Sequence, residues 1–288
     1  MEVLGIEVEP SLVRRWAGWL APARQPFFLT PQEAVNLDRT RRDLPGELRD
    51  TYEVWNVPAG LDVVWLDERA FRDLPRRARA ALVRAPVEHG RGAVPAVDGW
   101  TDVVEARVLR EQADGHHFVW WPSLVEARSD AVLERVVSDG HLTCRRASVP
   151  VEVWRAAAVG LPRAEALSGT FAEGSGPNCF GTVMAAAGVP DAAESWMQRE
   201  PFEAWLDAHC APGGEDDLPG TVLVWRDADL TSTHAAVTLG GGWALHKPSQ
   251  SWASPRQVVG VGDLVRTAAP GVALHRYSLR GAPGRQPG

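Results

Sequence analysis

Apolar and polar residues alternate with a period of two in a short segment near the end of the chain. The run 233–239 is followed by three glycines, Gly240–Gly242, and then by a second alternating run, 243–246. Such alternation is typical of half-buried strands, and glycines between two such runs favour a tight turn. The pattern therefore predicts a β-hairpin that carries one histidine in each strand, His234 and His246.

The length of the glycine loop decides whether these two histidines share a face of the sheet. A three-residue loop sets the pairing along the hairpin: Leu239 with Trp243, Val237 with Leu245, and Ala236 with His246. His234 then lies on the same face as His246, on a diagonal of roughly 7–8 Å between backbones. A two- or four-residue loop shifts the register by one residue and separates the histidines. The glycine count thus favours contact between the two imidazoles.

A glycine- and proline-rich loop at 174–178 runs directly into an apolar segment of small residues that begins at Cys179. This sequence predicts a helix whose first turn carries the thiol. Unpaired N–H groups and the positive end of the helix dipole stabilise negative charge there, so we expect a lowered thiol pKa. With His234 and His246 downstream, the chain contains a nucleophile, a base and an orienting group in that order.

These features resemble the NlpC-type branch of the papain-like cysteine peptidases. The resemblance covers about residues 170–250: a cysteine at a helix start, a strand over 218–225, a strand that begins with histidine, a glycine turn, and a second histidine. It implies an α+β papain-like catalytic half with an antiparallel sheet. It also implies that Cys179 is the nucleophile, His234 the general base and His246 the residue that orients the base, with Gln250 as the alternative third member.

The chain departs from the family pattern on both sides of the cysteine. Asn178 stands where the family has an aspartate that helps to receive the free amine of a cell-wall peptide, and Phe180 replaces a serine. We expect Asn178, Phe180, Trp225 and Gln250 to contact the substrate.

The resemblance implies an amidase, peptidase or acyltransferase that forms an acyl-enzyme from an amide, ester or thioester. Two alternatives stay open: a cell-wall peptide hydrolase, and a non-catalytic binding module on the same fold.

The catalytic pattern occupies only part of the 288 residues. Before it, β-branched and aromatic runs at 61–66 and 117–121 predict buried strands. Residues 68–84 and 129–138 predict helices, with Pro75 at a helix start or break. We divide the chain into three parts: an α/β region of unknown fold over 1–165, a papain-like cysteine hydrolase domain over 166–280, and a disordered tail over 281–288.

Composition excludes several classes of function. The net charge is −7, so no basic face for nucleic acid is expected. Cys144, Cys179 and Cys210 fit neither a disulfide framework nor a zinc motif, and we expect no metal and no other cofactor. An acidic N-terminus and the lack of a long apolar run predict a cytoplasmic protein without membrane contact. The expected partner is a small-molecule or peptide substrate; no oligomeric state is predicted.

Lys247 is the single lysine among 30 basic residues, a ratio typical of coding in a GC-rich bacterial genome. Strand alternation points its side chain to the face opposite His246. We expect an exposed charge at the end of the strand.

Overall fold

The computed structural model describes residues 1–34, 44–55, 57–91, 94–112 and 115–281. They form two compact units, of which the first comprises Met1 and Glu9–Val136 and the second comprises Glu2–Val8 and Val137–Gly288. Among the described residues, no helix has both the length and the apolar character needed to cross a membrane. Of the tail predicted over 281–288, only Gly281 is described; the rest lies outside the described residues.

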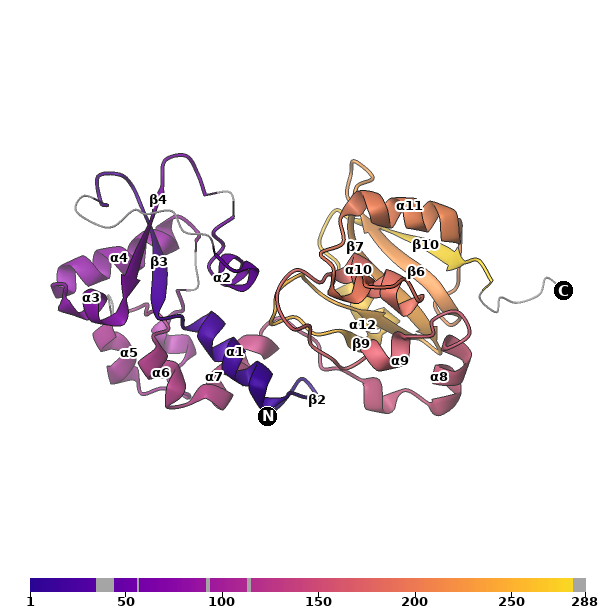
Figure 1. Cartoon of the computed structure of the whole chain (residues 1–288), viewed down its shortest axis with the longest axis horizontal. Helices are drawn as coiled ribbons and strands as arrows, with labels where there is room; N and C mark the ends of the chain where they lie inside the picture. Colours follow the sequence, from indigo (N-terminus) through magenta and orange to yellow (C-terminus); the bar gives the residue numbers. More distant parts are fainter. Residues whose placement is uncertain (35–43, 56, 92–93, 113–114, 282–288) are drawn as a thin grey trace. The chain divides into compact units, whose positions relative to one another are not determined.

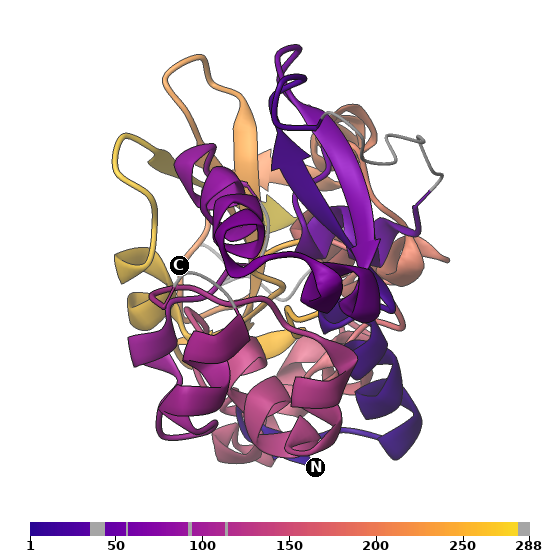
Figure 2. The ribbon, with the colours of Figure 1, turned by 90° about the vertical axis from the view of Figure 1, so that its left-hand side faces the viewer.

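The first unit contains a two-stranded antiparallel sheet and short helices. Strand β3 (Arg24–Leu29) pairs with β4 (Asp62–Asp67), and α4 (Arg76–Glu88) packs on β3 (Figures 1 and 2). The remaining α-helices are α1 (Pro10–Leu20), α2 (Gly46–Thr51), α3 (Glu68–Asp73), α5 (Ala106–Gln112), α6 (Pro122–Glu126) and α7 (Ser129–Ser138).

Aromatic rings fill the core of this unit. The rings of Phe27, Phe71 and Trp121 form a cluster: Phe71 lies 5.7 Å from Phe27 and 5.2 Å from Trp121, and Phe27 lies 6.4 Å from Trp121, measured between ring centroids. The predicted strand at 61–66, the helix break at Pro75 and the helix at 129–138 are confirmed. The predicted strand at 117–121 is wrong: these residues are mostly buried, but only His117 forms an isolated bridge, and Pro122 starts a helix.

The second unit is built on a six-stranded antiparallel sheet with the order β5-β10-β6-β7-β8-β9. These strands are β5 (Cys210–Pro212), β6 (Pro219–Arg226), β7 (Ser232–Gly240), β8 (Trp243–His246), β9 (Gln257–Gly260) and β10 (Ala273–Leu279). A short hairpin, β1 (Glu2–Val3) with β2 (Ile6–Glu7), also belongs to this unit. The chain is therefore a mixed α+β protein with antiparallel sheets.

Helices cover both faces of the six-stranded sheet (Figure 1). On one face, apolar side chains such as Val224 and Val237 pack against α10 (Cys179–Ala186) and α11 (Arg199–His209). On the other face, alternate side chains such as Leu223 and Ala236 pack against α12 (Val261–Arg266). The alternation along each strand thus separates two apolar cores.

The second unit begins before the boundary drawn at 165/166 from the sequence. Its helix α8 (Val151–Ala157) packs on β6 and β7, and α9 (Ala164–Leu167) packs on α10. Trp154 and Ala157 of α8 are buried in the same core as α10. The apolar face of α8 therefore attaches this segment to the main sheet.

Candidate functional site

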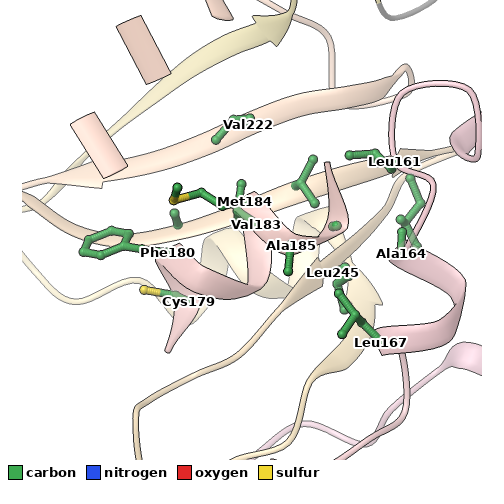
Figure 3. Packing of buried hydrophobic residues seen from close by; sticks show 14 of the residues in the cluster. Leu161, Ala164, Leu167, Cys179, Phe180, Val183, Met184, Ala185, Val222 and Leu245 are labelled. Carbon is green, nitrogen blue, oxygen red and sulfur yellow. The ribbon is translucent and has the colours of Figure 1, made fainter. Parts of the chain in front are cut away.

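The helix that begins at Cys179 is fixed by its cap and by a close packing contact. Asn178 accepts a hydrogen bond from the Gly181 N–H (3.0 Å) and donates one to the Met197 carbonyl (2.7 Å). A Cβ at Gly181 would lie 2.4 Å from the Ala192 carbonyl oxygen, so only glycine fits. The predicted helix start is confirmed, and Figure 3 shows Cys179 at this end of α10.

Burial changes the pKa of the Cys179 thiol in the direction opposite to our expectation. Cys179 is 8% exposed, and burial raises the pKa of its thiol to about 11. The N–H groups of Ala235, Phe180 and Cys179 itself, together with the charge of Lys247, stabilise the thiolate but only in part. The predicted lowering of this pKa is therefore wrong, because the loss of solvent outweighs the helix start.

The β7–β8 hairpin reaches the predicted register by a different turn. Gly240, not Leu239, pairs with Trp243, and the register shifts between Thr238 and Gly240. Gly240–Gly242 all have positive φ (93°, 58° and 77°), a conformation that favours glycine. A two-residue turn with an adjacent bulge thus replaces the predicted three-residue loop. The pairings of Ala236 with His246 and of Val237 with Leu245 are confirmed.

The two histidines meet on one face of the sheet. Nε2 of His234 lies 3.3 Å from Nδ1 of His246, and the rings are edge to face with centroids 5.5 Å apart. The predicted contact between them is confirmed. Burial lowers the pKa of His234 to about 4. Burial, followed by the nearby His234 and His141, lowers the pKa of His246 well below its ordinary value.

Cys179 approaches this pair through the backbone of β7. The N–H of Ala235, the residue that follows His234, stabilises the Cys179 thiolate. The expected hydrogen bond between Cys179 and His234 is not formed in this structure, where the His234 ring bonds to His246. By register, both imidazoles lie on the sheet face of Ala236, whereas α10 packs on the face of Ala235. The Cys179 sulfur and the two imidazoles therefore lie on opposite faces of the sheet, beside the neighbouring residues Ala235 and His234 of β7.

Gln257 completes the contacts of His246 and was not predicted. It pairs with His246 across β8 and β9, and its Nε2 lies 3.0 Å from Nε2 of His246. Its Oε1 is buried without a hydrogen-bond partner among the described residues. A half-turn of the amide exchanges these two atoms, and Oε1 then accepts a hydrogen bond from His246 Nε2–H. That orientation leaves His246 Nδ1 as an acceptor for His234 Nε2–H.

Lys247 is buried, and the expectation of an exposed charge is wrong. Its side chain has no exposed surface, and Nζ donates to the carbonyls of Ser249 (2.8 Å) and Ser251 (2.9 Å). The loop that these bonds hold is tied to the segment before Cys179: Gly176 N–H donates to Gln250 O, and Trp252 N–H donates to Ser175 Oγ. Lys247 therefore anchors the loop beside the thiol.

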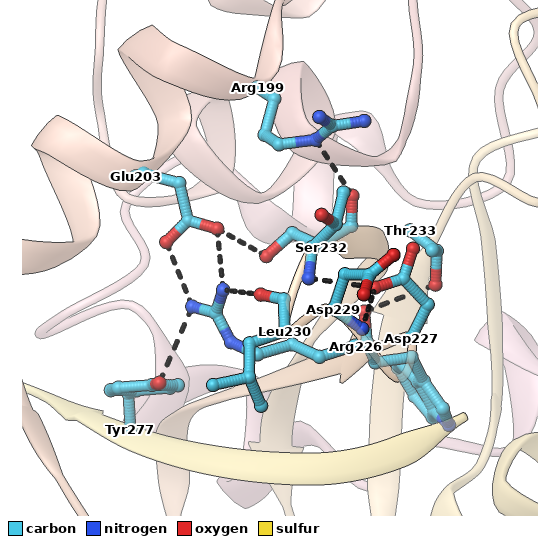
Figure 4. A network of polar contacts seen from close by, with 11 residues as sticks. Arg199, Glu203, Arg226, Asp227, Asp229, Leu230, Ser232, Thr233 and Tyr277 are labelled. Carbon is cyan, nitrogen blue, oxygen red and sulfur yellow. Dashed lines mark hydrogen bonds and ion pairs between the residues drawn. The ribbon is translucent and has the colours of Figure 1, made fainter. Parts of the chain in front are cut away.

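A polar network holds the β6–β7 turn that precedes His234 (Figure 4). Arg226 forms two hydrogen bonds of 2.8 Å with Glu203 of α11, and Ser232 also donates to Glu203. A register shift between Trp225 and Arg226 leaves Thr233 as an extra residue in β7. Such bulges re-aim neighbouring side chains, and here His234 faces Trp225 with ring centroids 5.3 Å apart.

A pocket of about 360 Å³ lies over the histidine pair. Trp225, His234 and His246 line it together with apolar residues of α12 and the loop after it. Three residues predicted to contact the substrate are not part of its lining. Asn178 caps α10, Phe180 stacks on Phe202 in the core (4.4 Å between centroids), and Gln250 is exposed.

Within the part of the chain that the structure describes, no group of three or more His, Cys, Asp or Glu side chains is arranged to hold a metal ion. A scan against protein-family models and searches of curated proteins and of solved structures found no match to this chain.

Proposed function

We propose that this protein is a cysteine-nucleophile amidase, peptidase or acyltransferase with a papain-like catalytic unit of the NlpC type. The observation that carries the proposal is the contact between His234 and His246. His234 is followed on β7 by Ala235, whose N–H stabilises the Cys179 thiolate. The nucleophile thus lies beside the residue that follows the base, and the orienting group contacts the base.

In the proposed reaction, the Cys179 sulfur attacks the carbonyl carbon of an amide, ester or thioester. The thiol proton passes to Nδ1 of His234, whose Nε2 is held by His246. His234 then protonates the leaving amine, alcohol or thiol as its bond to the carbonyl carbon breaks, which leaves a thioester on Cys179. Water or a second nucleophile accepts the acyl group, and the thiol is regenerated.

Cys179 and His234 are both uncharged in the resting protein. At neutral pH the thiol, with its pKa of about 11, keeps its proton, and His234, with its pKa of about 4, is unprotonated. His234 therefore acts as a general base during the attack instead of forming a stable ion pair with Cys179.

The substrate we propose is a small molecule or peptide rather than cell-wall peptide. A wall-peptide hydrolase of this family needs a carboxylate beside the nucleophile, and here the Asn178 side chain is engaged with Gly181 and Met197. We place the reaction in the cytoplasm, without a metal or other cofactor.

Turnover of a panel of thioesters and anilides by the purified protein tests this function. Cys179→Ala should abolish release of the thiol or amine. Cys210→Ala removes a thiol that is also buried but lies on β5, and it should keep wild-type turnover. Equal activity of the wild type and Cys179→Ala would reject the proposal.

The second candidate is a non-catalytic binding module, which the burial of Cys179 favours. A thiol that is 8% exposed, with its pKa raised to about 11, is a poor nucleophile unless a base assists it. In a binding module, His234→Ala would leave the alkylation rate of Cys179 at pH 7.5 unchanged. In the enzyme, the same substitution should slow alkylation by about 10-fold or more.

A further inference from the structure

The pocket over the histidine pair has an unusual lining for a site on a charged protein. None of its lining residues is an aspartate, glutamate, lysine or arginine. Its walls are formed mainly by Trp225, Pro248, Leu264, Ala268 and Val272. The two histidines are neutral at pH 7 because their pKa values are lowered by burial. A charged group placed here would lose its hydration without gaining a partner of opposite charge.

Most polar side-chain atoms of the lining already have partners. The hydroxyl of Thr233 donates to the Trp225 carbonyl (3.1 Å), and that of Thr267 donates to the Leu264 carbonyl (2.8 Å). Both ring nitrogens of His246 are engaged, one with His234 and one with Gln257.

Two polar side-chain atoms of the lining have no hydrogen-bond partner among the described residues: the indole N–H of Trp225 and Nδ1 of His234. One is a fixed donor and the other is the acceptor that a general base requires. The two rings are neighbours, with centroids 5.3 Å apart. An uncharged group that carries a carbonyl oxygen and an N–H matches this pair of atoms.

We propose that this pocket binds an uncharged, apolar acyl or amide group, with the carbonyl oxygen held by the Trp225 indole and the apolar part against α12. This inference rests on the proposed function, since it names the substrate class for the same site. His234 lines the pocket and directly precedes Ala235, whose N–H stabilises the Cys179 thiolate. A group bound here therefore lies next to the proposed base, on the sheet face opposite α10.

The test uses three probes of one chain length and different charge: hexanamide, hexanoate and hexylammonium. Their dissociation constants are measured by ligand-observed NMR on full-length Cys179→Ala, so no turnover is needed. Hexanamide should bind about 10-fold more tightly than either charged probe, because only the uncharged amide avoids the desolvation cost. Equal or tighter binding of a charged probe would overturn the proposal.

Two wedge variants locate the binding. Ala268→Phe and Ala269→Trp place large side chains at the lining, and Ala269 is exposed, so the second substitution leaves the core undisturbed. Each should weaken hexanamide binding by about 10-fold by occupying the pocket. Val265→Phe, on α12 but outside the lining, is the matched control and should bind like the parent.

Unchanged hexanamide binding in both wedge variants would also overturn the proposal. Because the readout is binding to a protein without the thiol, this failure is distinct from a failure of the enzyme hypothesis, which is decided by turnover in the wild type.

Discussion

At the scale of single residues, Gln257 decides which nitrogen of His246 carries the proton. If its amide oxygen accepts from His246 Nε2–H, then His246 Nδ1 accepts from His234 Nε2–H and His234 Nδ1 is left as the base. If its amide N–H donates instead, His246 Nδ1–H donates to His234 Nε2. His234 Nδ1 then carries a proton, which prevents it from acting as the base. Gln257 is therefore a positioning residue for the proposed reaction.

Gln257→Met keeps the length of the side chain and removes its hydrogen bond. We expect the rate of acyl transfer to fall by about 10-fold or more, because the tautomer of His246 is no longer fixed. Nitrogen-15 NMR of labelled histidine should show a change in the protonated nitrogen of His246. The matched control is Gln250→Met at an exposed position, with wild-type rate and spectrum. An active Gln257→Met variant with an unchanged spectrum would contradict this role.

Lys247 contributes a positive charge near Cys179 and hydrogen bonds that hold the loop after β8. Lys247→Met removes the donor to two loop carbonyls and also removes a charge that stabilises the Cys179 thiolate. We expect a lower melting temperature and a further upward shift in the pH at which Cys179 is alkylated. Both are measured on the purified variant, by thermal unfolding and by iodoacetamide labelling across pH. A melting temperature that falls without a shift in labelling would limit Lys247 to a structural role.

At the scale of elements, the hairpin explains what a change in the glycine loop does. In the structure, Gly241 and Gly242 form the turn, and Leu239 has no partner residue in β8. Removal of one glycine leaves a two-residue loop that pairs Leu239 with Trp243 and no longer requires the bulge. The pairing of Ala236 with His246 is then preserved.

A variant with two glycines in place of Gly240–Gly242 should therefore keep the contact between His234 and His246. Its stability should decrease, since the Gly241 N–H now bonds to the Asp217 carbonyl (3.0 Å) and the shortened turn changes that contact. Histidine NMR and turnover measure the outcome. Loss of the histidine contact in a folded variant would show that the bulge is needed to set the register.

Local pattern was sufficient to predict the parts of the site that lie close together in sequence. The period of two and the glycine turn predicted the shared face of His234 and His246, and the loop before Cys179 predicted the start of α10. Gln257 and the burial of Lys247 depend on the loop between β8 and β9, which has no periodic pattern. The raised thiol pKa depends on packing from distant segments, which the helix-start argument did not include.

At the scale of the whole molecule, every residue of the proposed site belongs to the second unit. The segment 137–165 joins the second unit because α8 buries Trp154 and Ala157 in the core beside α10. This placement was not predicted, since the amphipathic pattern of a short helix does not identify the surface against which it packs.

The lowered pKa values of His234 and His246 make the stability of the protein depend on pH. The pKa of His234 is about 4 when folded and 6.5 in the reference state, so the unfolded chain binds protons more readily between these values. Stability should therefore fall as the pH drops from 6.5 to 4, with His234 accounting for on the order of 3 kcal/mol. His246 acts in the same direction.

Urea unfolding at a series of pH values measures this effect as a difference between proteins. His234→Gln should show a shallower loss of stability from pH 6.5 to pH 4 than the wild type, since the substituted side chain does not titrate. Identical slopes for the two proteins would mean that His234 is not held neutral by burial.

The central claim, that Cys179 forms an acyl-enzyme with the help of His234, is tested most directly by trapping that intermediate. The protein is mixed briefly with 4-nitrophenyl hexanoate, quenched in acid, digested and mapped by mass spectrometry. We predict one hexanoyl group on the peptide containing Cys179, no modification of Cys144 or Cys210, and a strongly reduced yield in His234→Ala. Absence of the adduct on Cys179, or the same yield in His234→Ala as in the wild type, would contradict the account.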